Sequence, residues 1–356
     1  MKHRTIGSLI VVALLLSGCW DEQNFNQTIH VPMAGISGSP NELEVSFALP
    51  AIERKTEEAR TINVKGKSFH DARLAADAST HNQIDTSMLT ALIIEDQASE
   101  QDIYMYLDAF YRDVRNRLGL ALLISSGPAT PFIEYGTEFN DNINTLYNEM
   151  VVHLSETSQL PLIDLQIACT YLFDSGIDLQ LPYLEMDKES GIPKVTGVAL
   201  FHDTKFTGEK IPLKEMVVMQ MLKDDLGKRA IESILYNDVA LSYEIESLKR
   251  KVITEPASVQ LKYKLTVSIL DYSPDRIKNL TTRYEIERAI EKDLQVRASE
   301  LIQQMKTVSH DGLGIGRYYR AFHKNLFTNS TWSDTYTSLP IETLFEVEVR
   351  DWGIMD

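Results

Sequence analysis

Cys19 is the residue whose surroundings most clearly predict chemistry. It ends the stretch Leu16-Ser17-Gly18-Cys19, in which two small residues precede the cysteine. This pattern matches a bacterial lipobox: a diacylglyceryl group alkylates the thiol, and cleavage before the cysteine exposes an amine that can also be acylated. We therefore predict that Cys19 carries a diacylglyceryl group and an acyl group. No other cofactor is expected.

The residues before Cys19 have the layout of an export signal. Lys2 and Arg4 form a basic head, and the apolar run 6–16 follows them, as in a secretory signal peptide. The run is too short for a transmembrane helix, which needs about 20 apolar residues. The alternative is an ordinary signal peptide that holds an accidental cysteine. We expect residues 1–18 to be cleaved and the remaining chain to be held outside the cytoplasm by lipid.

A cluster of arginines and tyrosines forms the candidate interface: Arg317, Tyr318, Tyr319 and Arg320. These two residue types are enriched at binding hot spots, where they combine planar hydrogen bonding with large contact area. The alternative is structural, with Tyr318 packed in the core and Arg317 paired to a carboxylate of the same chain.

Three glycines precede this cluster at positions 312, 314 and 316. A dinucleotide-binding loop follows a strand and has its third glycine three residues after the second. Here an amphipathic segment precedes the loop and the spacing differs, so we predict a helix-to-helix connection. Gly312 is the expected left-handed residue that ends the first helix.

No catalytic, metal or cofactor-binding residues are predicted. The seven histidines after residue 18 include no metalloprotease spacing, and the sequence has neither a cysteine cluster nor a Gly-x-Ser-x-Gly motif. Cys169 would be the only remaining thiol, and its apolar surroundings favour a buried side chain over a reactive one. Glu287 and Glu291, beside Arg288 and Lys292, are interpreted as a solvated helix face.

The composition indicates a folded, acidic body. The chain has 356 residues, 44% of them hydrophobic, and a net charge of −16. Without residues 1–18 it keeps 33 basic and 51 acidic residues, a net charge of −18. Nucleic acid and bare anionic lipid are poor partners for such a surface.

The first half alternates strands and helices, which predicts an α/β layer arrangement. Strands are expected in 29–37, 42–50, 87–96 and 119–130, and helices in 67–80, starting at Ser68, 98–113 and 161–176. The polar stretch 131–160 has no predicted element. A boundary is expected in or just after the proline-containing stretch 176–194.

The second half has the clearest periodicities. Alternating apolar residues from Val259 to Ile269 predict a strand with one buried face. Residues 285–305 carry an apolar stripe at spacings of three and four, which predicts a long amphipathic helix. A last alternating strand is expected in 344–352.

These elements predict a mixed α/β, or α+β, multi-domain fold in which helices pack on mixed sheets, including a C-terminal sheet with a long amphipathic helix. The expected domains are a signal peptide (1–18), a lipidated tether (19–28), an N-terminal α/β region of one or two subdomains (29–190) and a C-terminal α/β domain (191–356).

Several stretches resemble the Ger(x)C family, the lipoprotein C subunits of spore germinant receptors. They are "CWDEQNFNQ" after the lipobox, "FYRDVRNRLGLALLIS", "GIDLQLPYLEM" with "VTGVALFHDTKFTGEKI", and "SHDGLGIGRYYRAFHKNLF". Together they span most of the chain after residue 18. The family commonly has Phe-Gly-Phe-Gly where this chain has Leu313-Gly314-Ile315-Gly316.

The resemblance implies a non-enzymatic subunit of a receptor for small nutrients. It implies integral-membrane A- and B-type subunits as partners, and a location on the outer face of the cell membrane that becomes the spore inner membrane. The family fold is mixed α/β in three domains. The alternative function is an independent lipid-anchored protein that binds a solute or a cell-wall fragment; an exported hydrolase has the least support.

Overall fold

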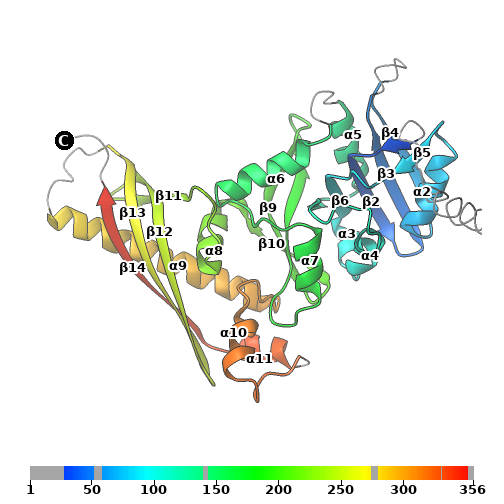
Figure 1. Ribbon diagram of the computed structural model, residues 1–356. Helices are drawn as coiled ribbons and strands as arrows, with labels where there is room; N and C mark the ends of the chain where they lie inside the picture. Colours follow the sequence, from blue (N-terminus) through cyan, green and yellow to red (C-terminus); the bar gives the residue numbers. More distant parts are fainter. Residues whose placement is uncertain (1–27, 52–57, 139–142, 274–279, 330, 352–356) are drawn as a thin grey trace, which may run out of the picture.

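The computed structural model describes residues 28–51, 58–138, 143–273, 280–329 and 331–351. Two large sheets lie toward opposite ends of an elongated molecule (Figure 1). The first has eight strands and the second has four. The structure confirms the predicted mixed fold class, including the C-terminal sheet with its long helix.

The eight-stranded sheet has the order β10-β9-β8-β7-β6-β2-β3-β4. Its central strands β2, β6, β7 and β8 run parallel, and the outer strands pair antiparallel. Every residue of β6 and β7 is buried, as expected for parallel strands covered on both faces. The bounds are β2 Met33–Ser39, β3 Glu42–Leu49, β4 Arg60–Gly66, β6 Ala91–Glu95, β7 Ala121–Ser125, β8 Gln180–Met186, β9 Pro193–His202 and β10 Lys205–Pro212.

This sheet contains the predicted strands 42–50, 87–96 and 119–130 as β3, β6 and β7. The predicted strand 29–37 is divided, because only its second part, β2, lies in this sheet. β2 and β3 form an antiparallel hairpin, and Asn41 in its turn adopts a positive φ of 72°, a conformation that asparagine tolerates better than most residues. Beside the sheet, β1 (Thr28–His30) and β5 (Gln83–Asp85) form a short parallel pair.

Helices cover both faces of the sheet. One core contains side chains of α2 (Phe69–Asp77), α4 (Tyr104–Arg112) and α7 (Leu165–Leu172); the other contains those of α5 (Thr130–Glu138) and α6 (Leu146–Glu156). Ser68 caps α2 as predicted, because its Oγ accepts a hydrogen bond from the Asp71 amide at 3.2 Å.

Two helix predictions need correction. The expected helix 98–113 is split into α3 (Asp96–Ser99) and α4. The stretch 131–160, which had no predicted element, holds α5 and α6. Each of these two helices buries only a narrow stripe, such as Tyr147 and Val151 in α6, so the helical periodicity is weak in the sequence.

The four-stranded sheet has the order β11-β12-β13-β14, with β13 and β14 parallel. Its strands are β11 Ile231–Tyr236, β12 Val239–Glu255, β13 Ser258–Tyr272 and β14 Ile341–Asp351, and α9 (Leu280–Thr307) covers one face. Both predicted periodicities are confirmed, because the apolar residues of each stripe are buried. They are Val259, Leu261, Tyr263, Leu265, Val267 and Ile269 in β13, and Ile286, Ile290, Leu294, Ala298, Leu301 and Met305 in α9.

The carboxylates of α9 correct another expectation. Glu287 Oε1 accepts a hydrogen bond from the Val349 amide at 2.9 Å, and Glu291 Oε1 accepts one from the Val347 amide at 3.1 Å. β14 is the edge strand of its sheet, so these outward amides lack a neighbouring strand. The two glutamates are therefore edge-strand partners and not a solvated face, and they block pairing with another chain at these amides.

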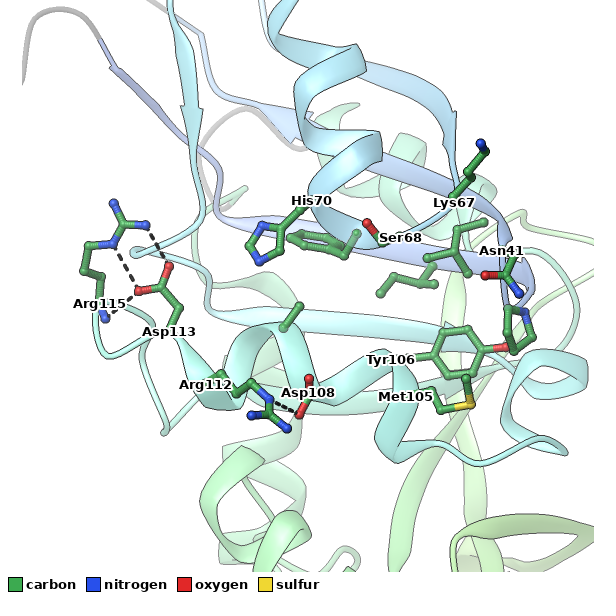
Figure 2. Close-up of a pocket in the computed structure, with 15 residues that line it drawn as sticks. Asn41, Lys67, Ser68, His70, Met105, Tyr106, Asp108, Arg112, Asp113 and Arg115 are labelled. Atoms are coloured by element: carbon green, nitrogen blue, oxygen red, sulfur yellow. Dashed lines mark hydrogen bonds and ion pairs between the residues drawn. The ribbon is translucent and has the colours of Figure 1, made fainter.

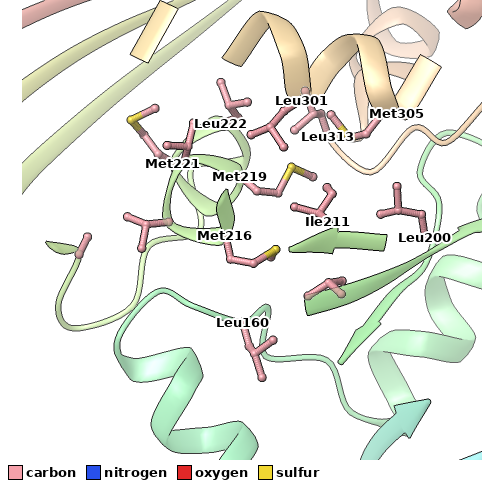
Figure 3. Close-up of a cluster of buried hydrophobic side chains, with 14 of the residues drawn as sticks. Leu160, Leu200, Ile211, Met216, Met219, Met221, Leu222, Leu301, Met305 and Leu313 are labelled. Carbon is pink, nitrogen blue, oxygen red and sulfur yellow. The ribbon is translucent and has the colours of Figure 1, made fainter. Parts of the chain in front are cut away.

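A continuous apolar core connects the two sheets. All residues from Met216 to Leu222 in α8 (Met216–Lys223) are buried, and Figure 3 shows this helix between β9, β10 and the C-terminal part of α9. The eight-stranded sheet also contains strands from both sides of residue 190. The regions 29–190 and 191–356 thus share one sheet and one core.

Candidate functional site: the junction around residues 310–320

The junction begins where α9 ends. Left-handed conformations occur at Ser309 (φ 55°) and Gly314 (φ 66°), so the prediction that Gly312 ends the helix in this way is wrong. Gly312 is needed for space, because a Cβ there would collide with the side chains of Gln180 and His310. The predicted helix-to-helix connection is confirmed, since α10 (Ile315–Phe322) follows.

His310 joins this connection to the eight-stranded sheet. The side chain is fully buried, and burial lowers its pKa, which favours neutral imidazole. Nδ1 then donates to the carbonyl of Phe201 in β9, and Nε2 accepts from Gln180 Nε2 in β8 at 3.0 Å. Gln180 Oε1 in turn accepts a hydrogen bond from Lys223 Nζ at 3.2 Å.

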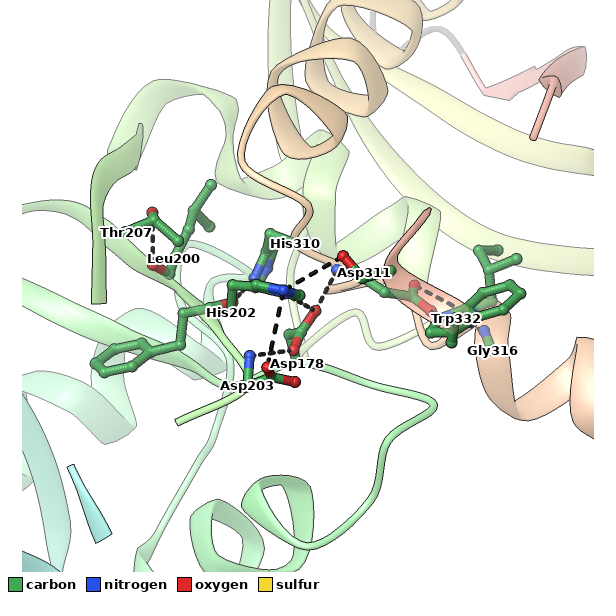
Figure 4. A network of polar contacts seen from close by, with 12 residues as sticks. Asp178, Leu200, His202, Asp203, Thr207, His310, Asp311, Gly316 and Trp332 are labelled. Carbon is green, nitrogen blue, oxygen red and sulfur yellow. Dashed lines mark hydrogen bonds and ion pairs between the residues drawn. The ribbon is translucent and has the colours of Figure 1, made fainter. Parts of the chain in front are cut away.

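Asp311 is the centre of the polar network (Figure 4). Its Oδ1 accepts from the Ile315 amide at 2.9 Å, and Oδ2 accepts from the Gly316 amide at 2.7 Å and from Trp332 Nε1 at 3.1 Å. Burial raises the pKa of Asp311 to about 7, although these three donors favour the ionised form. This one carboxylate holds the start of α10 and the start of α11 (Trp332–Ser338).

Asp178 connects Asp311 to the end of β9. Its Oδ2 accepts a hydrogen bond from the Asp311 amide at 2.6 Å, and its Oδ1 accepts one from the Asp203 amide at 3.0 Å. His202 lies beside it, with Nδ1 3.8 Å from Asp178 Oδ2. The Asp178 carboxylate raises the pKa of His202, so the pair gains stability when the imidazole is protonated.

Asp178, His202 and Asp203 also have ligand atoms within 4.8 Å of one another, a spacing that a metal ion could use. However, both oxygens of Asp178 already accept backbone hydrogen bonds, and the Asp203 side chain is 84% exposed. The contacts are those of a structural junction, and we assign no metal to it.

The four candidate interface residues lie on α10, next to this network. Asp174 holds both arginines: Arg317 Nε donates to Oδ2 at 2.8 Å and Arg320 Nη2 lies 3.0 Å from Oδ1. Arg317 also stacks over the ring of Tyr171, 4.9 Å from its centroid. The structural alternative of an intrachain ion pair is therefore present, while the arginine side chains stay partly exposed.

The two tyrosines differ. Tyr318 is 36% exposed, whereas Tyr319 is only 2% exposed. The Tyr319 ring packs 5.3 Å from that of Trp332, and its hydroxyl donates to the carbonyl of Pro256 at 3.0 Å. Tyr319 is thus a core residue and cannot contact a partner directly; the i, i+4 spacing from buried Ile315 was the signal for this in the sequence.

A pocket of about 660 Å³ lies between α2 and α4, away from α10 (Figure 2). Its two aspartates each pair with an arginine. Arg112 Nε donates to Asp108 at 2.6 Å, and Arg115 forms two hydrogen bonds with Asp113, at 3.0 and 2.7 Å. These pairs hold four of the charged side chains. Lys67 also lines the pocket, and we assign no ligand to it.

The two predicted cysteine environments have different outcomes. Cys19 lies outside the described residues, so its lipidation stays a prediction. Cys169 in α7 is fully buried, and burial raises the pKa of its thiol to about 12. The predicted burial is confirmed, and the low reactivity of the thiol stays a prediction. No described helix has the length and apolar character needed to span a bilayer.

Models of two known protein domains match this chain. Residues 21–186 match the model of a spore germination protein N-terminal domain, and residues 196–353 match that of a "Spore germination B3/ GerAC like, C-terminal" domain. The fold and these two matches define a spore germination protein. The chain belongs to the Ger(x)C family.

Two individual proteins are similar over nearly the whole chain. A putative spore germination protein YfkR of Bacillus subtilis (strain 168) is 19% identical over 375 residues, covering 97% of this chain and 96% of that protein. The crystal structure of the GerBC protein matches with a TM-score of 0.58 at 11% identity, covering 89% of this chain and 97% of that one. The latter similarity shows that the fold is shared.

Proposed function

We propose that this chain is a lipid-anchored, non-catalytic subunit of a nutrient germinant receptor. The observation that carries the proposal is the combination of two spore germination domains, matched over residues 21–186 and 196–353, with a lipobox that ends at Cys19. The acyl groups on Cys19 hold the body on the outer face of the cell membrane, later the spore inner membrane. Integral-membrane A- and B-type subunits are its partners.

The fold suits a role in receptor assembly or in transmitting the germinant-bound state. The core around α8 joins the two sheets. The hydrogen bonds of Asp311 hold the starts of α10 and α11, and those of His310 connect this junction to β8 and β9. Interiors packed in this way transmit displacement instead of absorbing it. A force applied at one end of the body would therefore reach the other end.

Tyr318, Arg317 and Arg320 form the proposed partner surface on α10. All three are partly exposed, and Asp174 orients the two guanidinium groups. Orientation before binding reduces the entropy lost on association. Buried Tyr319 supports this surface from beneath.

Substitution of Cys19 tests the anchor. We expect Cys19→Ala to move the protein from the membrane fraction to the soluble fraction and to impair nutrient germination. The matched control is Cys169→Ala, which removes the buried thiol and leaves the lipobox intact. Unchanged fractionation and unchanged germination of Cys19→Ala would contradict the anchoring proposal.

Substitution on α10 tests the partner surface. In the double variant Tyr318→Ala/Arg320→Ala, we expect less A- and B-type subunit to co-purify with the tagged protein. Arg112→Ala is the control, since Arg112 is an exposed arginine of α4 that pairs with Asp108 of the same helix, away from α10. Equal recovery from the double variant and the control would place the interface elsewhere.

A further inference from the structure

A second pocket, of about 570 Å³, lies where the end of α8, β12 and α10 meet. This volume is within the range of about 300–1,000 Å³ that is typical of small-molecule sites. Apolar side chains form part of its wall, and three cationic side chains also line it. The apolar residues are Ile177, Leu313 and Phe322, and the cationic residues are Lys223, Arg250 and Arg317.

Arg250 has the most informative contacts. Its Nη1 donates to the Lys223 carbonyl at 3.3 Å and to the Tyr318 hydroxyl at 3.4 Å. Its Nε and Nη2 are buried and have no hydrogen-bond partner among the residues that the structure describes. Buried donors without acceptors are unfavourable. These two N–H groups form the edge of a guanidinium that binds a carboxylate through two parallel hydrogen bonds.

The charges near Arg250 also favour an anion. Burial, together with the positive charges of Arg317 and Arg250, lowers the pKa of Lys223 to about 8, while Asp225 opposes the shift. Asp224 and Asp225 line the same pocket and are exposed. They partly offset the positive charge, so the pocket suits a single negative charge better than a double one.

Tyr318 covers the guanidinium. The Arg250 Cζ lies 5.3 Å from the centroid of the Tyr318 ring, and this tyrosine is 36% exposed. An aromatic side chain at the surface changes rotamer readily. Rotation of Tyr318 would uncover the Arg250 guanidinium, whose Nη1 contacts the Tyr318 hydroxyl.

We propose that this pocket binds a small monocarboxylate with an apolar body. The carboxylate accepts two hydrogen bonds from Nε and Nη2 of Arg250 once Tyr318 has turned aside. The apolar body lies against Leu313 and Ile177. This site shares Tyr318 and Arg317 with the proposed partner surface, but benzoate binding requires neither the lipid anchor nor a partner subunit. Loss of that binding would therefore leave the proposed function unchanged.

The test uses the full-length lipoprotein in detergent micelles and benzoate as the probe, followed by ligand-observed NMR. We expect saturable binding of benzoate and no saturable binding of benzamide, which has the same shape without the charge, or of inorganic phosphate. Arg250→Lys keeps the positive charge and removes the paired donors, so it should weaken benzoate binding by about tenfold or more. Arg60→Lys, at an exposed position of β4 outside the pocket lining, should bind benzoate like the wild type.

A second variant keeps the test valid if Arg250→Lys fails to fold. Ala321 is exposed on α10 and lines the pocket, so Ala321→Trp should fill the pocket without disturbing the core and should abolish binding. The proposal is overturned if benzoate shows no saturable binding to the wild type. Wild-type affinity in Arg250→Lys or in Ala321→Trp would overturn it equally.

Discussion

Replacement of Asp311 by alanine is the perturbation whose effect follows most directly from the structure. The substitution removes the acceptor of three buried donors: the amides of Ile315 and Gly316 and the indole of Trp332. Each unsatisfied buried donor costs about 1–3 kcal/mol, and removal of the buried carboxyl group offsets part of this cost. We expect the free energy of unfolding to fall by about 3–5 kcal/mol, a large part of the usual total of about 5–15 kcal/mol.

Asp311→Asn keeps the shape of the side chain but removes one of its two acceptor oxygens. Asparagine keeps one acceptor oxygen and presents an amide to a donor, so we expect a smaller loss of about 1–2 kcal/mol near pH 7. Burial raises the pKa of Asp311 from 3.8 to about 7. The folded protein therefore binds more protons than the unfolded chain between these values, and the stability from this group is present at low pH and lost as pH rises through about 7.

The pH dependence gives a second readout. The stability difference between wild type and Asp311→Asn should shrink as pH rises from about 4 to about 7, because asparagine does not titrate. The lowered pKa of His310 has the opposite effect on stability, which rises as the imidazole becomes neutral. Both proteins contain His310, so its contribution largely cancels in the comparison.

Urea unfolding followed by tryptophan fluorescence measures these differences, and buried Trp332 reports directly on the junction. Asp334→Ala is the control, since Asp334 is exposed on α11 and its loss should change stability by less than about 0.5 kcal/mol. A loss of less than about 1 kcal/mol for Asp311→Ala would refute the view that this carboxylate holds the junction together.

Three further predictions concern the rest of the fold. Met219→Ala in the core around α8 should lower the free energy of unfolding by about 2–5 kcal/mol; a loss within the range of surface substitutions would contradict the continuous core. The double variant Glu287→Ala/Glu291→Ala should speed hydrogen exchange of the outward amides in β14, and the exchange of β12 amides serves as the control. Native Cys169 should resist a thiol reagent at about pH 8 and react after unfolding in urea, because burial raises its pKa to about 12; rapid native reaction would contradict its burial.

The sequence predicts elements whose side-chain period is long and regular. The alternation in β13 and the stripe of α9 each repeat over many residues, and a single buried face explains each pattern. The N-cap at Ser68 is also local, since it needs only the residues that follow it. The family resemblance is confirmed by the two family models, which match residues 21–186 and 196–353.

The polar junction could not be predicted from the sequence because its partners are distant. The Asp311 amide donates a hydrogen bond to Asp178, which lies 133 positions earlier in the sequence. The His310 ring is hydrogen-bonded to the carbonyl of Phe201, 109 positions earlier. No local pattern encodes such pairs. Glu287 and Glu291 were misinterpreted for the same reason: the β14 amides that they accept from lie 62 and 56 positions further along the chain.

Affinity purification of the tagged lipoprotein from detergent-solubilised spore inner membrane, followed by mass spectrometry, tests the central claim most directly. A germinant receptor subunit should bring polytopic A- and B-type subunits with it, and the Cys19→Ala variant should recover less of them. Recovery of the lipoprotein alone, under conditions that preserve other membrane complexes, would contradict the receptor proposal. That result would favour an independent lipid-anchored protein that binds a solute or a cell-wall fragment.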